Sequence, residues 1–254
     1  MPETNESAPY RWSADHDYLT LPGLSDPSTV HLFGGRSLVS AADLSGVRSV
    51  VKVRQVHGRD VVQIDDRILS GMPEGDALMT DRPDILITIE TADCTPILLF
   101  DPARPAVAAI HAGWRGTVAN IVAATVRAMT AAYGSNPRTM RAGIGPTIGP
   151  CCYEVGREVW DRVEQGFSYG QMAVHPPDQA FSTKDQDDPS DKAHLDLVRL
   201  NTLQLIEAGL PPTQVVASGL CTACERDHFY SYRRDAGRVG RHVSGILLKR
   251  PGTS

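Results

Sequence analysis

Two histidines and one cysteine stand in three separate apolar runs of the sequence. His57 lies in VVKVRQVHG, Cys94 in ILITIETADCTPILLF and His111 in AVAAIHAGWRG. One thiolate and two neutral imidazoles form a ligand set suited to a catalytic zinc, whose fourth position holds water or substrate. The same residue types also suit a cysteine nucleophile with a histidine base. Either chemistry requires the three runs to converge in space.

The surroundings of these residues favour a shared site over three unrelated core positions. A lone cysteine in an apolar run is more often an inert core residue. Here, however, Thr91 and Asp93 precede Cys94, and a glycine-rich AGWRG stretch follows His111. Polar residues and glycines at the ends of buried strands are where α/β-type chains expose site residues. The sequence therefore predicts chemistry at these strand ends.

Two neighbours of the trio are further candidates. Asp93 could serve as a general acid or base, or could orient a ligand. Side chains alternate along a strand, so an unbroken strand would point Asp93 away from Cys94. A bulge or turn is therefore required at TADC. Gln55, two residues before His57, would share its strand face and reach a substrate.

The hydrophobic pattern predicts an α+β chain. Short Val-, Ile- and Leu-rich runs predict strands at 29–33, 49–56, 61–64, 85–91, 96–100, 106–111, 141–144, 214–218 and 242–248. Apolar residues at helical spacing predict a helix from about Val118 to Ala132, closed by Gly134, and shorter helices around 159–163 and 195–206. The acidic stretch 176–192 is expected to be a solvated loop. We interpret residues 1–9 as a disordered lead and 10–254 as one domain.

Composition excludes several classes of protein. The net charge of −5 argues against a general nucleic-acid binder or a binder of anionic membranes. No apolar run approaches the roughly 20 residues that span a bilayer, and the polar N-terminus lacks the order of a signal peptide. Five cysteines, an odd count, suit a reducing compartment. We therefore expect a cytoplasmic protein; the sequence does not give its oligomeric state.

The other cysteines are assigned no site. Cys221 and Cys224 form a CxxC, but no second CxxC accompanies it, so a zinc ribbon is not expected. Cys151 and Cys152 are adjacent, and a disulfide between adjacent residues is strained. We interpret this pair as packing thiols.

Five segments together resemble a known family. RQVHGRDVV, TADCTPILLFDP, AAIHAGWRGT, GIGPTIGPCCYEVG and FYSYRRDAGRVGR are similar to the YfiH family, also called the multicopper polyphenol oxidase or laccase-domain family, which includes the bacterial peptidoglycan editing factor. The blocks run in family order from about His31 to Leu248. The resemblance implies a single-domain α/β/β/α sandwich similar to the cytotoxic necrotizing factor fold. It also implies that His57, Cys94 and His111 bind zinc, or copper in its place.

The same motifs contain candidate substrate-binding residues. Guanidinium groups suit bidentate binding of phosphate, and an aromatic ring can stack on a base, although any single arginine is more often in a surface ion pair. The candidates are Arg36, Arg115, Tyr232, Arg233 and Arg234. The chain departs from the family after its early arginine: SLVSAADLSG replaces a GGVS-type turn and a longer segment. That abbreviation alters one wall of the expected site.

The resemblance implies three activities. The first is zinc-dependent phosphorolysis of adenosine, inosine and methylthioadenosine, with deamination of adenosine. The second is copper-dependent phenol oxidation, although none of the eight histidines forms the HxH pairs of a conventional laccase. The third is hydrolysis of a wrongly loaded amino acid from a cell-wall precursor. A non-enzymatic metal-binding module is the alternative from another class. We favour the first, with a purine nucleoside and phosphate as partners.

Overall fold

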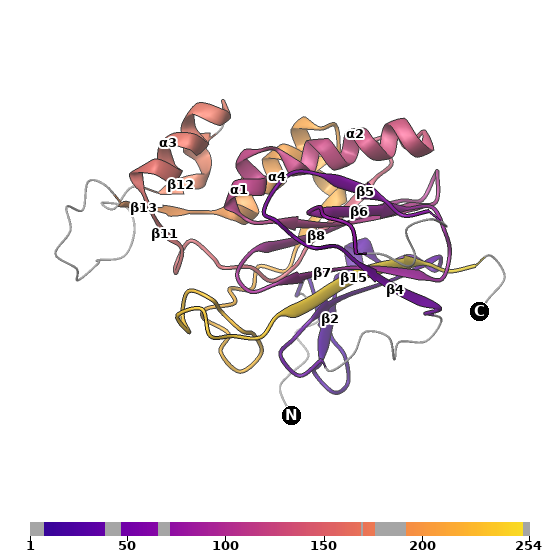
Figure 1. The fold of residues 1–254 in the computed structure, drawn as a ribbon, viewed down its shortest axis with the longest axis horizontal. Helices are drawn as coiled ribbons and strands as arrows, with labels where there is room; N and C mark the ends of the chain where they lie inside the picture. The colour runs from indigo at the N-terminus through magenta and orange to yellow at the C-terminus, as the bar shows by residue number, and fades with distance from the viewer. Residues whose placement is uncertain (1–7, 39–46, 66–71, 169, 176–191, 251–254) are drawn as a thin grey trace.

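Two six-stranded sheets packed face to face form the centre of the molecule (Figure 1). The computed structural model describes residues 8–38, 47–65, 72–168, 170–175 and 192–250. The first sheet is antiparallel except where β4 runs parallel to β7. In spatial order its strands are β1 (Arg11–Trp12), β2 (Tyr18–Thr20), β3 (Thr29–Gly34), β15 (His242–Leu248), β7 (Ile85–Thr91) and β4 (Ser49–Lys52).

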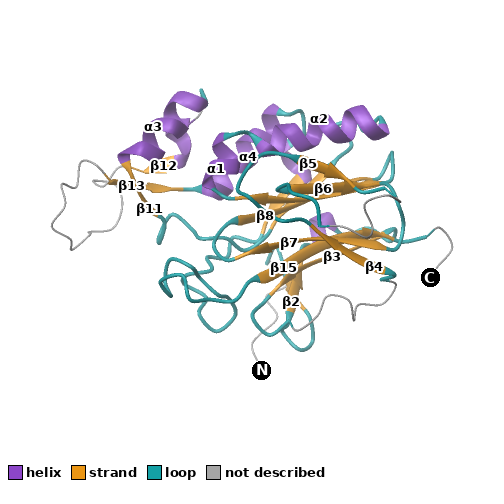
Figure 2. Ribbon diagram, in the orientation of Figure 1, coloured by secondary structure: helices purple, strands orange, loops and turns teal. Residues whose placement is uncertain are grey.

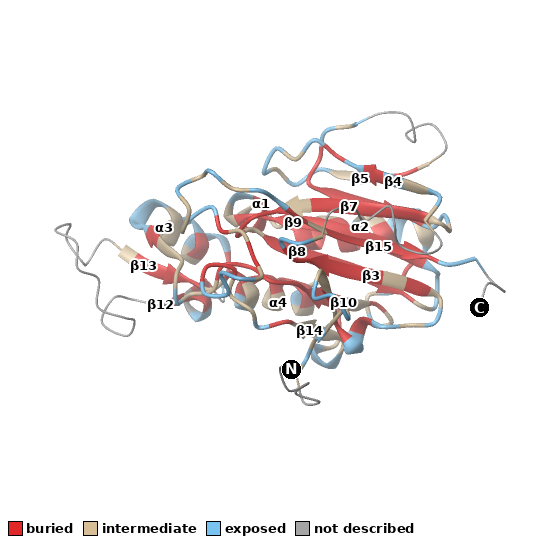
Figure 3. Ribbon diagram, turned by 90° about the horizontal axis from the view of Figure 1, so that it is seen from below, coloured by how far each residue is buried: buried red, intermediate tan, exposed pale blue. Residues whose placement is uncertain are grey.

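The second sheet contains the two longest apolar hairpin strands. It is antiparallel at its centre and parallel at both edges. In spatial order its strands are β14 (Val215–Ala217), β10 (Arg141–Ile144), β8 (Thr95–Asp101), β9 (Ala106–Ala112), β6 (Ala77–Thr80) and β5 (Val61–Gln63). All residues of β8 and β9 are buried, because both faces of this sheet are covered (Figure 3).

Helices cover the outer face of the second sheet (Figure 2). They are α1 (Trp114–Val118), α2 (Ile121–Tyr133) and α4 (Leu197–Glu207). Strand β8 shows how one sequence serves two interfaces: Leu98 and Phe100 pack between the sheets, whereas Ile97 and Leu99 pack under the helices. This is the period-2 alternation of a strand buried on both faces. Helix α2 ends as predicted at Gly134, whose φ of 68° is the left-handed conformation of a helix stop.

A smaller unit lies at one end of the sheets (Figure 1). It holds α3 (Arg157–Gly166) and a three-stranded sheet of β11 (Glu154–Gly156), β13 (Lys192–Leu195) and β12 (Val174–His175). Three short 3-10 helices complete the described elements: η1 (Pro22–Leu24), η3 (Gly170–Ala173) and η5 (Pro212–Gln214). None of the helices in the described ranges has the length and apolarity needed to cross a membrane.

The structure is a mixed α/β fold, and the finer α/β/β/α order of layers is not confirmed. Of the two six-stranded sheets, only the second has α-helices on its outer face among the described residues (Figure 2). On the outer face of the first sheet, Leu32, Leu86 and Leu247 are packed by side chains such as Leu38 and Val47. These two residues flank 39–46, which lie outside the described residues, as do residues 1–7 of the expected lead and 176–191 of the expected acidic loop.

Candidate active site

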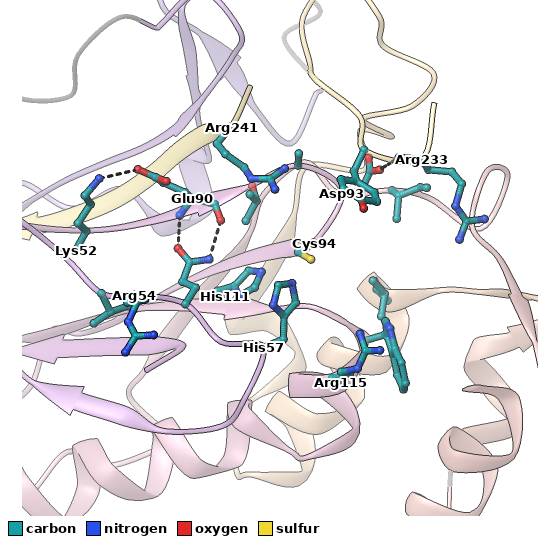
Figure 4. Close-up of a pocket in the computed structure, with 18 of the residues that line it drawn as sticks. Lys52, Arg54, His57, Glu90, Asp93, Cys94, His111, Arg115, Arg233 and Arg241 are labelled. Atoms are coloured by element: carbon teal, nitrogen blue, oxygen red, sulfur yellow. Dashed lines mark hydrogen bonds and ion pairs between the residues drawn. The ribbon is translucent and has the colours of Figure 1, made fainter. Parts of the chain in front are cut away.

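The ligand atoms of His57, Cys94 and His111 lie within 4.8 Å of one another. Cys94 follows β7 and immediately precedes β8, and His111 is on the adjacent strand β9. His57 comes from the loop between β4 and β5, and its ring lies edge-on to that of His111 with centroids 4.8 Å apart (Figure 4). Three segments distant in sequence therefore present one thiol and two imidazoles to a common point.

The conformation at His57 differs from the expected strand. Strand β4 ends at Lys52, and His57 has φ of 59°. The cause is Asp76, a fully buried residue just before β6. Its carboxylate accepts hydrogen bonds from the backbone N–H of Val56 at 3.2 Å, of His57 at 2.9 Å and of Gly58 at 2.6 Å. Because one carboxylate collects three successive N–H groups, the chain turns there and cannot continue as a strand.

Asp76 also orients the second imidazole. Its Oδ1 lies 2.8 Å from Nδ1 of His111, which leaves Nε2 of His111 for the shared point. A carboxylate behind an imidazole fixes its tautomer and is the usual arrangement for metal-binding histidines. Asp76 is not predictable from the sequence, since nothing in the local pattern EGDALMT marks a residue whose partners are 18 to 35 positions away.

Electrostatics at the trio favour charged forms. Burial raises the pKa of Cys94, but hydrogen bonds from His111 and His57 outweigh it and bring the pKa to about 6. Burial lowers the pKa of His111, but Asp76 and the Cys94 thiolate raise it to about 9. The free-energy cost of ionising Cys94 in this site is therefore small. Among the described residues, no fourth His, Cys, Asp or Glu joins the thiolate and the two imidazoles. Three such ligands fit a catalytic zinc site with one open position.

Asp93 lines the pocket, and three donors engage its carboxylate. The turn that the sequence requires at TADC is present: β7 ends at Thr91, β8 begins at Thr95, and Asp93 has φ of 80°. The Asp93 carboxylate accepts hydrogen bonds from Thr222 Oγ1 at 2.6 Å, Ser231 Oγ at 3.0 Å and the Arg233 backbone N–H at 2.7 Å. With three donors, Asp93 ties the Cys94 turn to two distant loops, which argues against its use as a general acid or base.

A pocket of about 740 Å³ opens beside the trio. Four arginines line it, and three of them lie over aromatic rings that also line it. Their guanidinium carbons lie 4.4 Å (Arg115 over Trp114), 5.2 Å (Arg233 over Tyr153) and 6.0 Å (Arg241 over Tyr232) from the ring centroids. Figure 4 shows Arg115, Arg233 and Arg241 around the trio. The pocket therefore offers both positive charge and flat apolar surface. Arg241 and Tyr153 were not anticipated, although both stand inside segments that carry the family resemblance.

Lys52 and Arg54 also line the pocket but have acidic partners. Lys52 Nζ lies 3.2 Å from Glu90 Oε1, and Arg54 pairs with Glu74. Their charges are thus partly balanced before any ligand arrives.

Two predicted substrate residues lie away from this pocket. Arg36 lines a separate cavity with Tyr230 and Arg234; its Nη1 donates to the Arg226 carbonyl at 2.7 Å. Arg234 forms a bidentate pair with Asp235 at 2.8 and 2.7 Å and donates to three backbone carbonyls. Arg36, with Arg233 or Arg234, was expected to line the pocket beside the trio; Arg233 does, whereas Arg36 and Arg234 line the separate cavity.

Gln55 does line the pocket, but its amide is engaged. Its Nε2 donates to the carbonyl of Glu90 at 2.8 Å and its Oε1 accepts from the N–H of Glu90 at 2.7 Å. The Gln55 side-chain amide thus bonds to the backbone of β7 in the way that a neighbouring strand would. In this structure Gln55 positions the His57 loop, and its amide does not face a ligand as expected.

The fold and the trio define a mixed α/β protein with a candidate metal centre in a cationic, aromatic pocket. A family model described as multi-copper polyphenol oxidoreductase laccase matches residues 31–249, so the chain belongs to that family. The chain is 35% identical over 203 residues to a purine nucleoside phosphorylase of Bacteroides thetaiotaomicron, covering 76% of this chain and 71% of that protein. It is 36% identical over 209 residues to adenosine deaminase RL5 of an unknown prokaryote, covering 79% and 75%.

Solved structures agree with the fold. The YfiH protein of Bacillus licheniformis superposes with a TM-score of 0.83 at 29% identity, covering 95% of this chain and 99% of that one. YlmD of Geobacillus stearothermophilus gives a TM-score of 0.81 at 26% identity, covering 96% and 100%. The mixed α/β architecture is thus shared along nearly the whole chain, and the relatives' names support an enzyme.

Proposed function

We propose that this chain is a zinc-dependent purine nucleoside phosphorylase that also deaminates adenosine. The observation that carries the proposal is the placement of three arginine–aromatic pairs around a thiolate–imidazole trio in one pocket. Phosphorolysis needs a site for an anion and a site for a flat heterocycle, and this pocket has the side chains for both. The names of the relatives from Bacteroides thetaiotaomicron and Deinococcus radiodurans agree with it.

His57, Cys94 and His111 would hold the zinc, with Asp76 behind His111. When bound, zinc would supply a Lewis acid at the pocket. Asp76 keeps the Nδ1 proton of His111 directed at its carboxylate, so Nε2 is the nitrogen that would give up its proton to bind the metal. Without that carboxylate the ring would be free to rotate and to exchange tautomers.

The arginines and aromatic rings would bind the two substrates. In phosphorolysis a phosphate oxygen bonds to the ribose C1′ while the C1′–N9 bond breaks, and the electron pair leaves on the purine, which takes up a proton. Arg115 and Arg233 would hold the phosphate oxygens against the ribose, since guanidinium groups bind such oxygens in pairs. Trp114, Tyr153 and Tyr232 provide the faces on which a purine stacks.

Phenol oxidation is the second candidate, because the matching family model is described as a laccase. Copper binds the same N and S ligands more tightly than zinc. Zinc has no redox states, so the two activities require different metals in one site.

The deciding experiment compares the two metals in one preparation. Zinc-loaded, copper-free protein should convert adenosine and phosphate to adenine and ribose 1-phosphate, form inosine without phosphate, and leave phenolic dyes unoxidised. Added copper should suppress nucleoside turnover as dye oxidation appears. Cys94→Ala, loaded in parallel, should lack both activities and serves as the control for contaminating enzymes. Efficient phenol oxidation under copper, with no nucleoside turnover under zinc, would overturn the proposal in favour of an oxidase.

A further inference from the structure

Four of the five cysteines gather at a second place in the fold. Cys151 and Cys152 lie in the turn that follows GPTIGP, and Cys221 and Cys224 lie in the turn that follows β14. All four sulfur atoms lie within 4.8 Å of one another. The Cys224 sulfur is 3.6 Å from that of Cys151 and 3.5 Å from that of Cys152. The adjacent pair, interpreted from the sequence as packing thiols, thus lies beside the CxxC.

We propose that Cys151, Cys152, Cys221 and Cys224 bind one structural zinc ion as thiolates. Zinc–sulfur bonds of about 2.3 Å in a tetrahedron place neighbouring sulfurs roughly 3.8 Å apart. The observed separations are close to that value, and small adjustments of side chains would close the tetrahedron. A disulfide would need about 2.05 Å between two sulfurs and would leave the other two without a partner.

The backbone already holds both turns in position for such a site. Cys221 bridges to Thr147, and the Thr222 N–H donates to the Thr147 carbonyl at 3.0 Å. The Gly149 N–H donates to the Cys221 sulfur at 3.2 Å, which is the kind of contact that orients a metal-bound thiolate. A Cβ on Gly149 would lie 3.3 Å from both the Cys151 sulfur and the Cys221 Cβ. The loops thus bring the four sulfurs together before any ion binds.

Arg234 holds the CxxC turn from outside. Its guanidinium donates to the carbonyls of Thr222 and Ala223, at 3.1 and 3.3 Å, inside that turn. Its charge is paired with Asp235 at 2.8 and 2.7 Å. The contribution of Arg234 is therefore to fix the backbone that carries Cys221 and Cys224.

The site is closed, and its effect on the pocket is indirect. None of the four cysteines lines the pocket, and four protein ligands leave no open position, which is the property of a structural zinc. Thr222, between the two cysteines of the CxxC, donates to Asp93 next to Cys94, and Tyr153, next to Cys152, lines the pocket. A zinc here would pin the loop that supplies Ile148 and Tyr153 to the pocket wall against the turn that carries Thr222.

Metal analysis of the Cys94→Ala protein tests the proposal, because that variant lacks the pocket trio but keeps the four cysteines. Purified under reducing conditions, it should retain one zinc per chain, and Cys94→Ala with Cys224→Ser should retain none. Cobalt in place of zinc should give the intense visible bands of a tetrahedral thiolate complex in Cys94→Ala. The cobalt spectrum uses intact ligands, so it stays informative if Cys224→Ser fails to fold.

Two results would overturn the proposal. One is Cys94→Ala protein that takes up neither zinc nor cobalt although its four remaining thiols are reduced. The other is a disulfide among the four in freshly purified protein, seen as a loss of two titratable thiols and of two hydrogens in the intact mass. Neither outcome depends on nucleoside turnover, so this proposal can fail while the proposed function stands.

Discussion

The two sulfur-containing clusters differ in what surrounds them. The pocket trio has one thiol and two imidazoles, a carboxylate behind one ring, and a cavity of about 740 Å³ in front. The four-cysteine cluster has only thiols, and backbone groups and an arginine pack against its two turns. Three ligands beside a cavity leave room for a substrate, whereas four ligands between loops do not. The same kind of ion would therefore do chemistry in one place and join chain segments in the other.

Their positions in the fold fit this division. The trio is built at the ends of β7 and β9 and on a loop tied down by Asp76, so it rests on the most buried part of the molecule. The cysteine cluster joins two surface turns that lie beyond the ends of β10 and β14. A catalytic site needs rigid secondary structure beneath its side chains. A metal that cross-links two loops stabilises the protein most where those loops would otherwise move.

The largest expected effect separates catalysis from stability. Cys94→Ala should lower nucleoside turnover by more than about 100-fold, since losing a ligand exceeds the loss from a supporting residue, with a melting temperature within a few degrees of the parent. Cys224→Ser should do the reverse. It should lower the melting temperature, while turnover measured well below that temperature stays within a few fold of the parent. Calorimetry and steady-state assays on both variants measure this. Equal loss of activity in the two would show that the clusters are one functional unit.

The next effect concerns the carboxylate that only the pocket cluster has. Asp76→Asn should weaken zinc binding at the trio by about 10- to 100-fold, because the amide cannot accept from all four of its present donors. Zinc competition titrations in the Cys224→Ser background would isolate this site. Asp101→Asn is the matched control: Asp101 is also fully buried and its Oδ1 accepts two hydrogen bonds, but it lies at the far end of β8. Similar zinc affinities in the two variants would contradict the role given to Asp76.

A smaller effect distinguishes the arginines of the two cavities. Arg233→Ala should raise the KM for phosphate roughly 10- to 100-fold, as expected for a charge-assisted contact worth about 1.5–3 kcal/mol. Arg36→Ala should leave that KM within about two-fold, because Arg36 lies over Tyr230 in the separate cavity. Initial rates at varied phosphate decide between them. A phosphate defect in Arg36→Ala alone would restore the assignment that the sequence suggested.

The elements that sequence analysis located well are those with local signals. β7, β10 and β15 have the predicted bounds, and α2 stops at the glycine that was named. β6 was missed because a four-residue strand, ALMT, is too short to show a period. β4 was predicted too long because VVKVRQV continues an alternating pattern after Lys52, where Asp76 turns the chain.

The site was predictable in its ligand types but not in its supports. His57, Cys94 and His111 could be named because their residue types and flanking motifs are distinctive. Asp76 could not, since its role depends on loop 56–58 and β9 meeting around it. The arginines of SYRRD are adjacent in sequence, yet Arg233 lines the pocket and Arg234 backs the CxxC turn. Residue type alone cannot predict which arginine lines the pocket, because this depends on the direction in which each side chain points.

The smallest expected effects come from adding one methyl group beside each cluster, by a glycine-to-alanine substitution. A Cβ on Gly113 would lie 3.0 Å from the Cys94 sulfur and 3.2 Å from His57 Cδ2, whereas one on Gly149 would crowd Cys151 and Cys221. Neither glycine is among those with positive φ, so alanine fits both backbones and acts by crowding alone. Gly113→Ala should reduce turnover a few fold and weaken zinc at the trio. Gly149→Ala should lower the melting temperature by several degrees, as about 1 kcal/mol of overpacking does in a domain of this size.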